Sequence, residues 1–220
     1  MHNAEHEKDE PGKGGTLAWK AIASSIFEIE FNGNRYAMKL FHDNGDPGFT
    51  KKGRDLNRFR CELRAYRNLR IFGVCKRGFV LRNYGYIDRL DPTKLQPYLD
   101  HFANDQYNPR AILLEYLPNA EELNCAKYSD RRFQKAIDGI NEIHSALIHH
   151  HDIYPRDILV VPGNPERVLW IDFDVATTFN DKESMGSQGE EYCKYEEELV
   201  ASFGELLDQR QGLPPNTKYY

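Results

Sequence analysis

The sequence predicts an α+β fold with a small β-rich N-terminal half and a shortened helical C-terminal half. Alternating apolar and polar residues on both sides of Asn32-Gly33-Asn34 indicate a β-hairpin over residues 24–41. Apolar residues at helical spacing over residues 129–148 indicate an amphipathic helix in the second half. The 220 residues suffice for one domain, or for two small lobes, with a buried core.

Composition narrows the class of protein. Apolar residues make up 40% and charged residues 29%, as in ordinary soluble proteins. The net charge of −5 gives no basic excess that would favour nucleic acid as a partner. The four cysteines form no CxxC pair, so we expect reduced thiols in an intracellular, cytoplasmic setting rather than a zinc site or disulfides. No apolar run reaches about 18 residues, so no membrane span is expected.

The other elements follow from periodicity and turn residues. One helix, over 54–70, carries an apolar stripe of Leu56, Phe59, Leu63 and Tyr66. Its arginines indicate a solvated basic face, with a local anion or partner patch as the alternative. Ser129 or Asp130 is expected to cap the helix of the second half. In chain order, the remaining predictions are a polar disordered tail over 1–15, strands within 78–87 and 109–118, a turn and strand over 161–176, a polar loop over 177–190, a helix over 192–207 and a mobile tail over 209–220.

Two charged residues fall on buried faces of predicted elements. Lys39 lies among apolar neighbours in the second strand of the hairpin, where a lysine is costly unless it is paired. Glu62 shares a helix face with Phe59 and Tyr66, so its carboxylate could pair with Lys39. The alternatives are a lysine on the solvent side of its strand and a surface glutamate paired with a neighbouring arginine.

The stretch HHHDIYPRDILVV, residues 149–161, brings acids and histidines together ahead of an apolar run. Adjacent histidines point in different directions, and no HExxH or Cys/His spacing accompanies them, which argues against a zinc site. We expect His150 to brace the loop by hydrogen bonding. Asp172, fifteen residues after Asp157, follows another apolar strand in LWIDFDVA.

These stretches together resemble the protein-kinase-like fold. YAMKLF resembles the V-A-I-K strand, HHDIYPRDIL the H-R-D-L-x-x-x-N loop, and IDFD the D-F-G motif. The sequence looks most like fungal kinase-like proteins with a DIYPRNIL-type loop, and its loop is also similar to that of aminoglycoside and choline kinases, H-G-D-x4-N. The resemblance runs from about Leu17 to Leu207, and implies a bilobal fold with an N-lobe over 16–118 and a shortened C-lobe over 119–208.

The resemblance implies an ATP- and Mg²⁺-dependent phosphotransferase with a hydroxyl-bearing acceptor, a protein or a small molecule. Lys39 would touch the α- and β-phosphates and pair with Glu62, and Asp152 would orient the acceptor hydroxyl and take its proton. Magnesium would be held by Asp157 and Asp172. In the hinge, Leu114 would take the gatekeeper position, and backbone groups of Glu115 and Leu117 would meet adenine.

Several departures from the kinase pattern favour alternatives. The turn at residues 21–25, AIASS, has no glycine, although glycine lets backbone amides approach phosphate freely. Asp157 stands where the pattern has asparagine, and Asp174 stands where it has glycine. Only 46 residues follow Asp174, and no A-P-E segment is found among them. The alternatives are a pseudokinase that acts as a nucleotide- or partner-binding scaffold, and a small-molecule kinase of the aminoglycoside or choline type.

Overall fold

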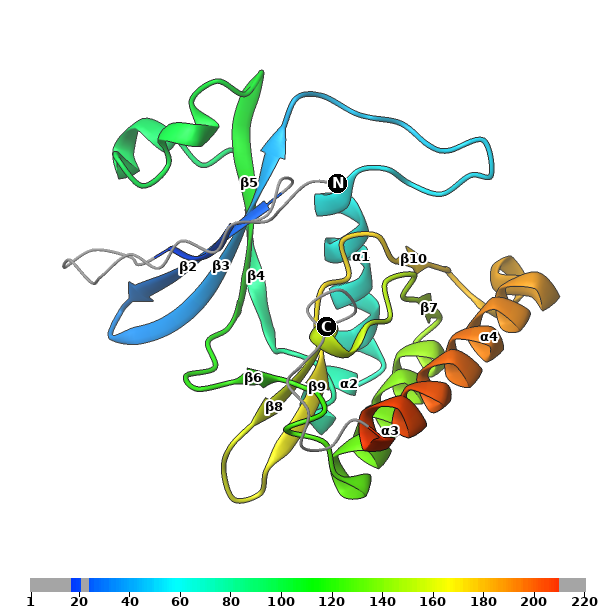
Figure 1. Ribbon diagram of the computed structural model, residues 1–220. Coiled ribbons are helices and arrows are strands. Elements are labelled where there is room, and N and C mark those ends of the chain that lie inside the picture. The colour runs from blue at the N-terminus through cyan, green and yellow to red at the C-terminus, as the bar shows by residue number, and fades with distance from the viewer. Residues whose placement is uncertain (1–16, 21–23, 210–220) are drawn as a thin grey trace.

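An antiparallel sheet of five strands forms the N-terminal part of the chain. The computed structural model describes residues 17–20 and 24–209 (Figure 1). The strand order is β1-β2-β3-β5-β4. Its members are β1 (Leu17–Lys20), β2 (Ser24–Phe31), β3 (Asn34–Asp43), β4 (Asn83–Ile87) and β5 (Tyr107–Glu115). The turn predicted to approach phosphate lies mostly at residues 21–23, outside the described residues. The predicted tail over 1–15 also lies outside them, as does all of the predicted tail over 209–220 except Gln209, which belongs to α4.

The predicted hairpin is confirmed. Asn32 and Gly33 connect β2 and β3 with φ angles of 51° and 72°, the left-handed pair that a tight hairpin turn requires. The register pairs Lys39 with Ile26 on one side and with Ile112 on the other. Lys39 therefore lies in the middle strand of the sheet.

Helix α1 (Arg58–Ile71) packs beside this sheet. Asn57 caps its N-terminus, where the Asn57 side chain accepts a hydrogen bond from the Arg60 amide at 3.0 Å. The predicted apolar stripe is wrong at Leu56, which precedes the helix and is 39% exposed. The buried residues are Phe59, Cys61, Glu62, Ala65, Tyr66 and Leu69.

Between α1 and β5 the prediction of a strand over 78–87 holds only in part. The short helix α2 (Val74–Arg77) precedes this segment and ends at Gly78, which has a left-handed conformation. Within the segment, only β4 is paired as a strand. Two 3₁₀ segments, η1 (Pro92–Leu95) and η2 (Asp100–Phe102), then lead to β5. Leu99 and Phe102 of this region form a small second core with β2 and β3.

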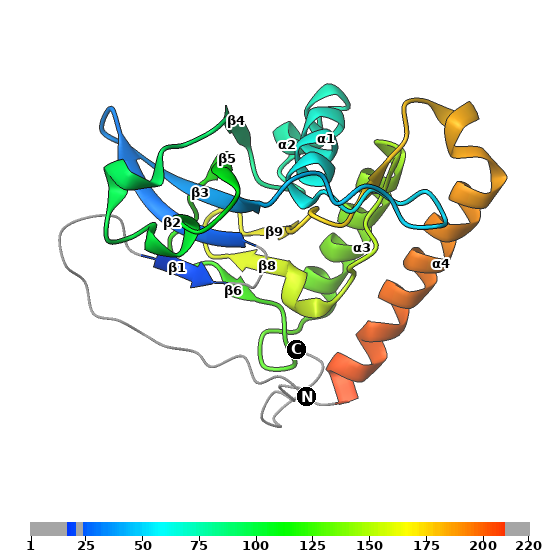
Figure 2. The ribbon, with the colours of Figure 1, turned by 90° about the horizontal axis from the view of Figure 1, so that it is seen from above.

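The C-terminal part is built on two helices, α3 (Asp130–Ser145) and α4 (Lys182–Gln209), which lie side by side (Figures 1 and 2). Ser129 caps α3, as predicted. The small strands are β6 (Glu121–Glu122), β8 (Ile158–Val161) and β9 (Arg167–Trp170) in one sheet, and β7 (Ile148–His149) and β10 (Thr177–Thr178) in another; η3 (Pro155–Asp157) precedes β8.

The prediction of a polar loop over 177–190 is wrong in its second half. Helix α4 begins at Lys182, ten residues before the predicted start, and bends at Gly186, whose φ of 59° and ψ of 179° are not helical. Met185 and Cys193 are buried in a small cluster with Leu147. This tertiary packing stabilises helix in a stretch whose two glycines disfavour it.

One main core connects the sheet side to the helical part. Its members include Tyr66 of α1, Ile112 of β5, Ile140 of α3, Trp170 of β9 and Val200 of α4. Figure 1 shows α1 between the sheet and the pair α3 and α4. The division into two lobes at residue 118 remains a prediction. Within residues 17–20 and 24–209, no helix has the length and apolar character needed to cross a membrane.

We predict that Gly204→Ala destabilises the protein. An added Cβ would overlap the Phe133 ring, 2.9 Å from its Cδ1, where α4 meets α3. The free energy of unfolding should fall by about 1–3 kcal/mol because the two helices must separate. In an exposed helix the same change would raise it by about 1 kcal/mol. Urea denaturation measures the difference.

Ser202→Ala, on the exposed side of α4, is the matched control and should change stability by less than about 0.5 kcal/mol. A Gly204→Ala variant as stable as the wild type would contradict the close α3–α4 contact.

Candidate functional site

A buried ion-pair cluster surrounds the Lys39 ammonium. Its Nζ donates to Glu62 Oε2 at 2.5 Å and to Asp172 Oδ1 at 2.8 Å, and lies 3.9 Å from Asp174 Oδ2. Lys39 is 3% exposed and Glu62 1% exposed. The structure thus brings together Lys39, Glu62 and Asp172, which are far apart in the sequence. The surface alternatives for Lys39 and Glu62 are wrong, because both side chains are buried.

The charges in this cluster are unequal in number. Burial alone would lower the pKa of Lys39, but the three carboxylates raise it, so the ammonium stays charged. Burial raises the pKa of Glu62 to about 8, against the effect of Lys39. Burial would also raise the pKa of Asp172, but Lys39 holds it below its usual value. One ammonium therefore serves more than one carboxylate.

His150 fixes the loop that carries Asp152, as predicted. The Asp152 amide donates to His150 Nδ1 at 3.3 Å, so the proton on Nε2 can be donated to the Ile171 carbonyl at 3.1 Å. Burial lowers the pKa of His150, in keeping with a neutral ring. The ring also packs on Phe173, with centroids 4.8 Å apart. These contacts join the Asp152 loop to the loop that carries Asp172.

Asp157 is a buried carboxylate with an unsatisfied oxygen. It is 6% exposed, and its Oδ2 has no hydrogen-bond partner within the described residues. Arg156 Nε lies 3.9 Å from that oxygen. Burial and the charges of Asp152 and Asp172 raise the pKa of Asp157 to about 8. This environment favours either a proton or a cation on Asp157.

Magnesium fits the donor set of Asp157 and Asp172. Both offer carboxylate oxygens, which Mg²⁺ prefers, and it commonly binds one or two carboxylates together with substrate phosphates. A cation there would relieve the repulsion that raises the pKa of Asp157. Within the part of the chain that the structure describes, no three His, Cys, Asp or Glu side chains form a metal-binding group by themselves.

Backbone strain occurs at both acidic loops. Asp172 has a φ of 65° and His151, next to Asp152, a φ of 70°. Residues other than glycine adopt this left-handed conformation at a cost, and it is concentrated at functional sites. The surrounding contacts of His150 hold both loops in place despite that cost.

The predicted hinge residues lie at the end of β5. Leu114 is buried, and Leu117 packs against the main core. The Glu115 amide donates to the Arg82 carbonyl at 2.9 Å, so this amide is already occupied. The Glu115 carboxylate pairs with Arg167 at 2.7 Å. The contacts of these residues with a nucleotide remain a prediction.

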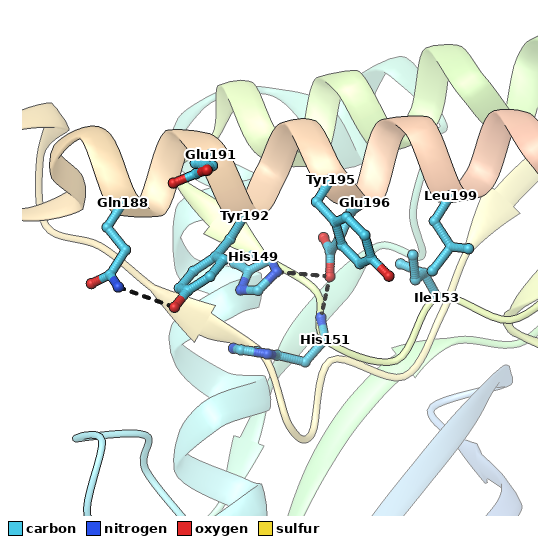
Figure 3. A pocket seen from close by; sticks show the side chains of 9 residues that line it. All are labelled: His149, His151, Ile153, Gln188, Glu191, Tyr192, Tyr195, Glu196 and Leu199. Carbon is cyan, nitrogen blue, oxygen red and sulfur yellow. Dashed lines mark hydrogen bonds and ion pairs between the residues drawn. The ribbon is translucent and has the colours of Figure 1, made fainter.

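Glu196 of α4 is a site residue that the sequence analysis missed. It is 3% exposed and accepts a hydrogen bond from the His150 amide at 3.1 Å. It accepts a second from the His151 amide at 2.7 Å (Figure 3). The imidazoles of His144 and His149 lie 2.9 and 3.1 Å from its oxygens. Burial would raise the pKa of Glu196, but these neighbours hold it well below its usual range.

A sequence signal for Glu196 exists. It lies on the same helix face as the buried Cys193, Val200 and Leu207, at spacings of three, four and eleven residues. An acid on an apolar stripe is costly unless it is paired. Glu196 is the first of three consecutive glutamates, and this charged run hid that signal.

A cavity of about 600 Å³ lies between α4 and the Asp152 loop (Figure 3). Its wall includes Ile153, the residue after Asp152. Tyr192 lies stacked on His149, with centroids 5.6 Å apart. The lining residues are His149, His151, Ile153, Gln188, Glu191, Tyr192, Tyr195, Glu196 and Leu199.

Comparison with known proteins gives the fold. No protein-family model and no curated protein matches the sequence. Among solved structures, 1131 chains match. One, WaaP in complex with acyl carrier protein, has a TM-score of 0.51 and 16% sequence identity, over 91% of this chain and 73% of that chain. At this identity the likeness shows the fold alone, which is kinase-like, with a β-rich N-terminal sheet and a helical C-terminal part.

We predict that Asp157→Asn stabilises the protein, and more so at high pH. Because the pKa of Asp157 is raised to about 8, the folded state binds a proton that the unfolded state loses above about pH 4. The wild type therefore loses stability as the pH rises from 4 to 8. At pH 8 the variant should gain about 1–3 kcal/mol, and at pH 5 less. Denaturation without Mg²⁺ at several pH values measures this.

Asp88→Asn removes an exposed carboxylate and serves as the control, with no pH-dependent gain expected. An Asp157→Asn gain that was equal at pH 5 and pH 8 would show that Asp157 does not titrate in this range.

Proposed function

We propose that the protein is an ATP- and Mg²⁺-dependent phosphotransferase of the kinase-like superfamily, which transfers the γ-phosphoryl group of ATP to a hydroxyl acceptor. The observation that carries this proposal is the buried ion pair of Lys39 and Glu62, directed at Asp172. A fully buried ammonium beside a loop with a strained aspartate is costly to maintain. Phosphate binding is a function that would explain why this costly arrangement is maintained.

The proposed roles are those that the kinase resemblance implies, and the geometry of the site is compatible with them. Lys39 binds the α- and β-phosphates, and Glu62 holds its ammonium in position. Asp152 is partly accessible, with 34% of its side chain exposed, and can meet an acceptor. It accepts the proton of the hydroxyl whose oxygen bonds to the γ-phosphorus, while the bond from that phosphorus to the β–γ bridging oxygen breaks and ADP leaves.

Asp157 and Asp172 would hold the magnesium ion. When bound, the ion would neutralise charge on the β- and γ-phosphates. Asp172 also accepts a hydrogen bond of 2.8 Å from Lys39 through its Oδ1. Glu62 retains its own bond to Lys39 and keeps the ammonium directed at the site.

A pseudokinase scaffold is the second candidate, and the environment of Asp157 favours it. A carboxyl whose pKa is raised to about 8 is largely protonated at pH 7 and is then a poor magnesium ligand. Nucleotide binding without transfer would be the signature of this function.

For the acceptor we propose the cavity between α4 and the Asp152 loop. Among the lining residues that the structure describes there is no lysine or arginine. This lining disfavours an acceptor that carries a phosphate or another strong anion. Protein hydroxyls and uncharged or amine-bearing small alcohols, as in kinases of the aminoglycoside or choline type, remain compatible with it.

We predict that Mg-ATP stabilises the wild type against heat. With about 1 mM Mg-ATP and a Kd of roughly 0.1 mM, the Tm should rise by about 3–6 °C. Lys39→Met and Asp172→Asn should each abolish most of the shift, because one removes the phosphate cation and the other a metal ligand. Differential scanning fluorimetry measures it, and ATP with EDTA is the control. An unchanged wild-type Tm would exclude a working nucleotide site.

We predict that Asp152→Asn separates binding from transfer. The variant should keep the Mg-ATP shift, because Asp152 contacts the acceptor, but should form ADP about 10²–10⁴ times more slowly. ADP formation is followed with a panel of protein and small-molecule alcohols, with Asp88→Asn as the control. A wild type that binds Mg-ATP but neither transfers nor hydrolyses it with any acceptor would favour the scaffold function.

A further inference from the structure

A second ion pair connects α1 to the Asp172 loop. Asp174 is 5% exposed, and both of its carboxylate oxygens lie 2.9 Å from Arg58 Nη1. Arg58 is the first residue of α1, one helical turn before Glu62, so both side chains lie on the face that meets this loop. None of the three stretches that carry the kinase resemblance, YAMKLF, HHDIYPRDIL and IDFD, includes Arg58.

The two ion pairs act on the same helix. Glu62 reaches the Asp172 loop through Lys39, and Arg58 reaches it directly. Beside these pairs, Tyr66 packs edge to face on Phe173, with centroids 5.5 Å apart. Helix α1 is therefore fixed to residues 172–174 at three successive turns, by a salt bridge, a buried ion pair and a ring contact.

The pairing of Arg58 with Asp174 also affects the charges around the Lys39 ammonium. Asp174 Oδ2 lies only 3.9 Å from Lys39 Nζ. Without Arg58, the Asp174 carboxylate would be a buried anion whose nearest cation is the ammonium needed for phosphate. A buried carboxylate that loses its partner seeks another. Lys39 would then be held by three carboxylates, none of which has another cationic partner within the described residues.

We propose that Arg58 is a positioning residue: its ion pair with Asp174 holds α1 against the Asp172 loop and keeps Asp174 from accepting a hydrogen bond from Lys39. A glycine at position 174 would leave the loop flexible, whereas the ion pair of Arg58 with Asp174 restrains it. The consequence for phosphate binding rests on the proposed function. The consequence for the position of α1 does not, so the two are tested separately.

Cysteine alkylation tests the position of α1 without a nucleotide. Cys61, in α1, and Cys125, outside it, are both 2% exposed. In native protein at pH 8 with excess iodoacetamide, Arg58→Met should speed alkylation of Cys61 about three- to tenfold relative to Cys125, as mass spectrometry of the peptides would show. Arg67→Met, an exposed arginine of the same helix, should leave the ratio unchanged, and Arg58→Lys should largely restore it.

Two results would overturn this part of the proposal. An unchanged Cys61 to Cys125 ratio in Arg58→Met would show that the pair does not hold α1. Equal acceleration at both cysteines would show a loss of global stability instead. Because Cys125 reports global unfolding in the same sample, a variant that folds poorly is still interpretable.

Nucleotide affinity tests the effect on Lys39. Arg58→Met should weaken Mg-ATP binding about three- to tenfold by calorimetry, and adding Asp174→Asn should recover most of the loss, because the competing carboxylate is then removed. The double variant should still alkylate rapidly at Cys61. A double variant that bound no better than Arg58→Met would overturn the effect on Lys39. A wild type that does not bind Mg-ATP would refute the proposed function, while the alkylation ratio would still decide the position of α1.

Discussion

The buried ammonium of Lys39 is the constraint on which the rest of the site depends. A lysine in the middle strand of a sheet must be compensated, and the compensation comes from Glu62 of α1 and Asp172 of the loop after β9. These acids lie 23 and 133 residues away along the chain. Satisfying one charge therefore fixes the sheet, the helix and the C-terminal loop relative to one another, and the main core fills the space between them.

A second set of buried polar contacts holds the opposite side of the site. Glu196 of α4 binds two consecutive amides of the Asp152 loop, and His150 joins that loop to the carbonyl of Ile171. The strained backbone at His151 and Asp172 lies between these anchors. Such strain persists only where surrounding contacts determine the conformation. Contacts with α4 therefore position the Asp152 loop, and contacts with α1 position the Asp172 loop.

The charges of the site are unevenly paired. Asp157 keeps a buried oxygen that has no hydrogen-bond partner within residues 17–20 and 24–209, and burial together with the charges of Asp152 and Asp172 raises its pKa to about 8. In a protein with no use for a cation at this position, asparagine or an apolar residue would be more stable. Asp174 differs from Asp157, because a side chain of the same chain, Arg58, is its cationic partner.

Local sequence patterns were enough to predict several features of the chain. These are the hairpin at Asn32-Gly33, the capped α3, and the acids after the apolar strands, since turn residues, caps and periodicity act over a few residues. It also indicated which charges needed partners. The folded structure was needed to find three other features: the early start of α4 at Lys182, the role of Glu196, and the pairing of Arg58 with Asp174, which lie 116 residues apart. Such pairings depend on how distant elements pack, and no local pattern carries that information.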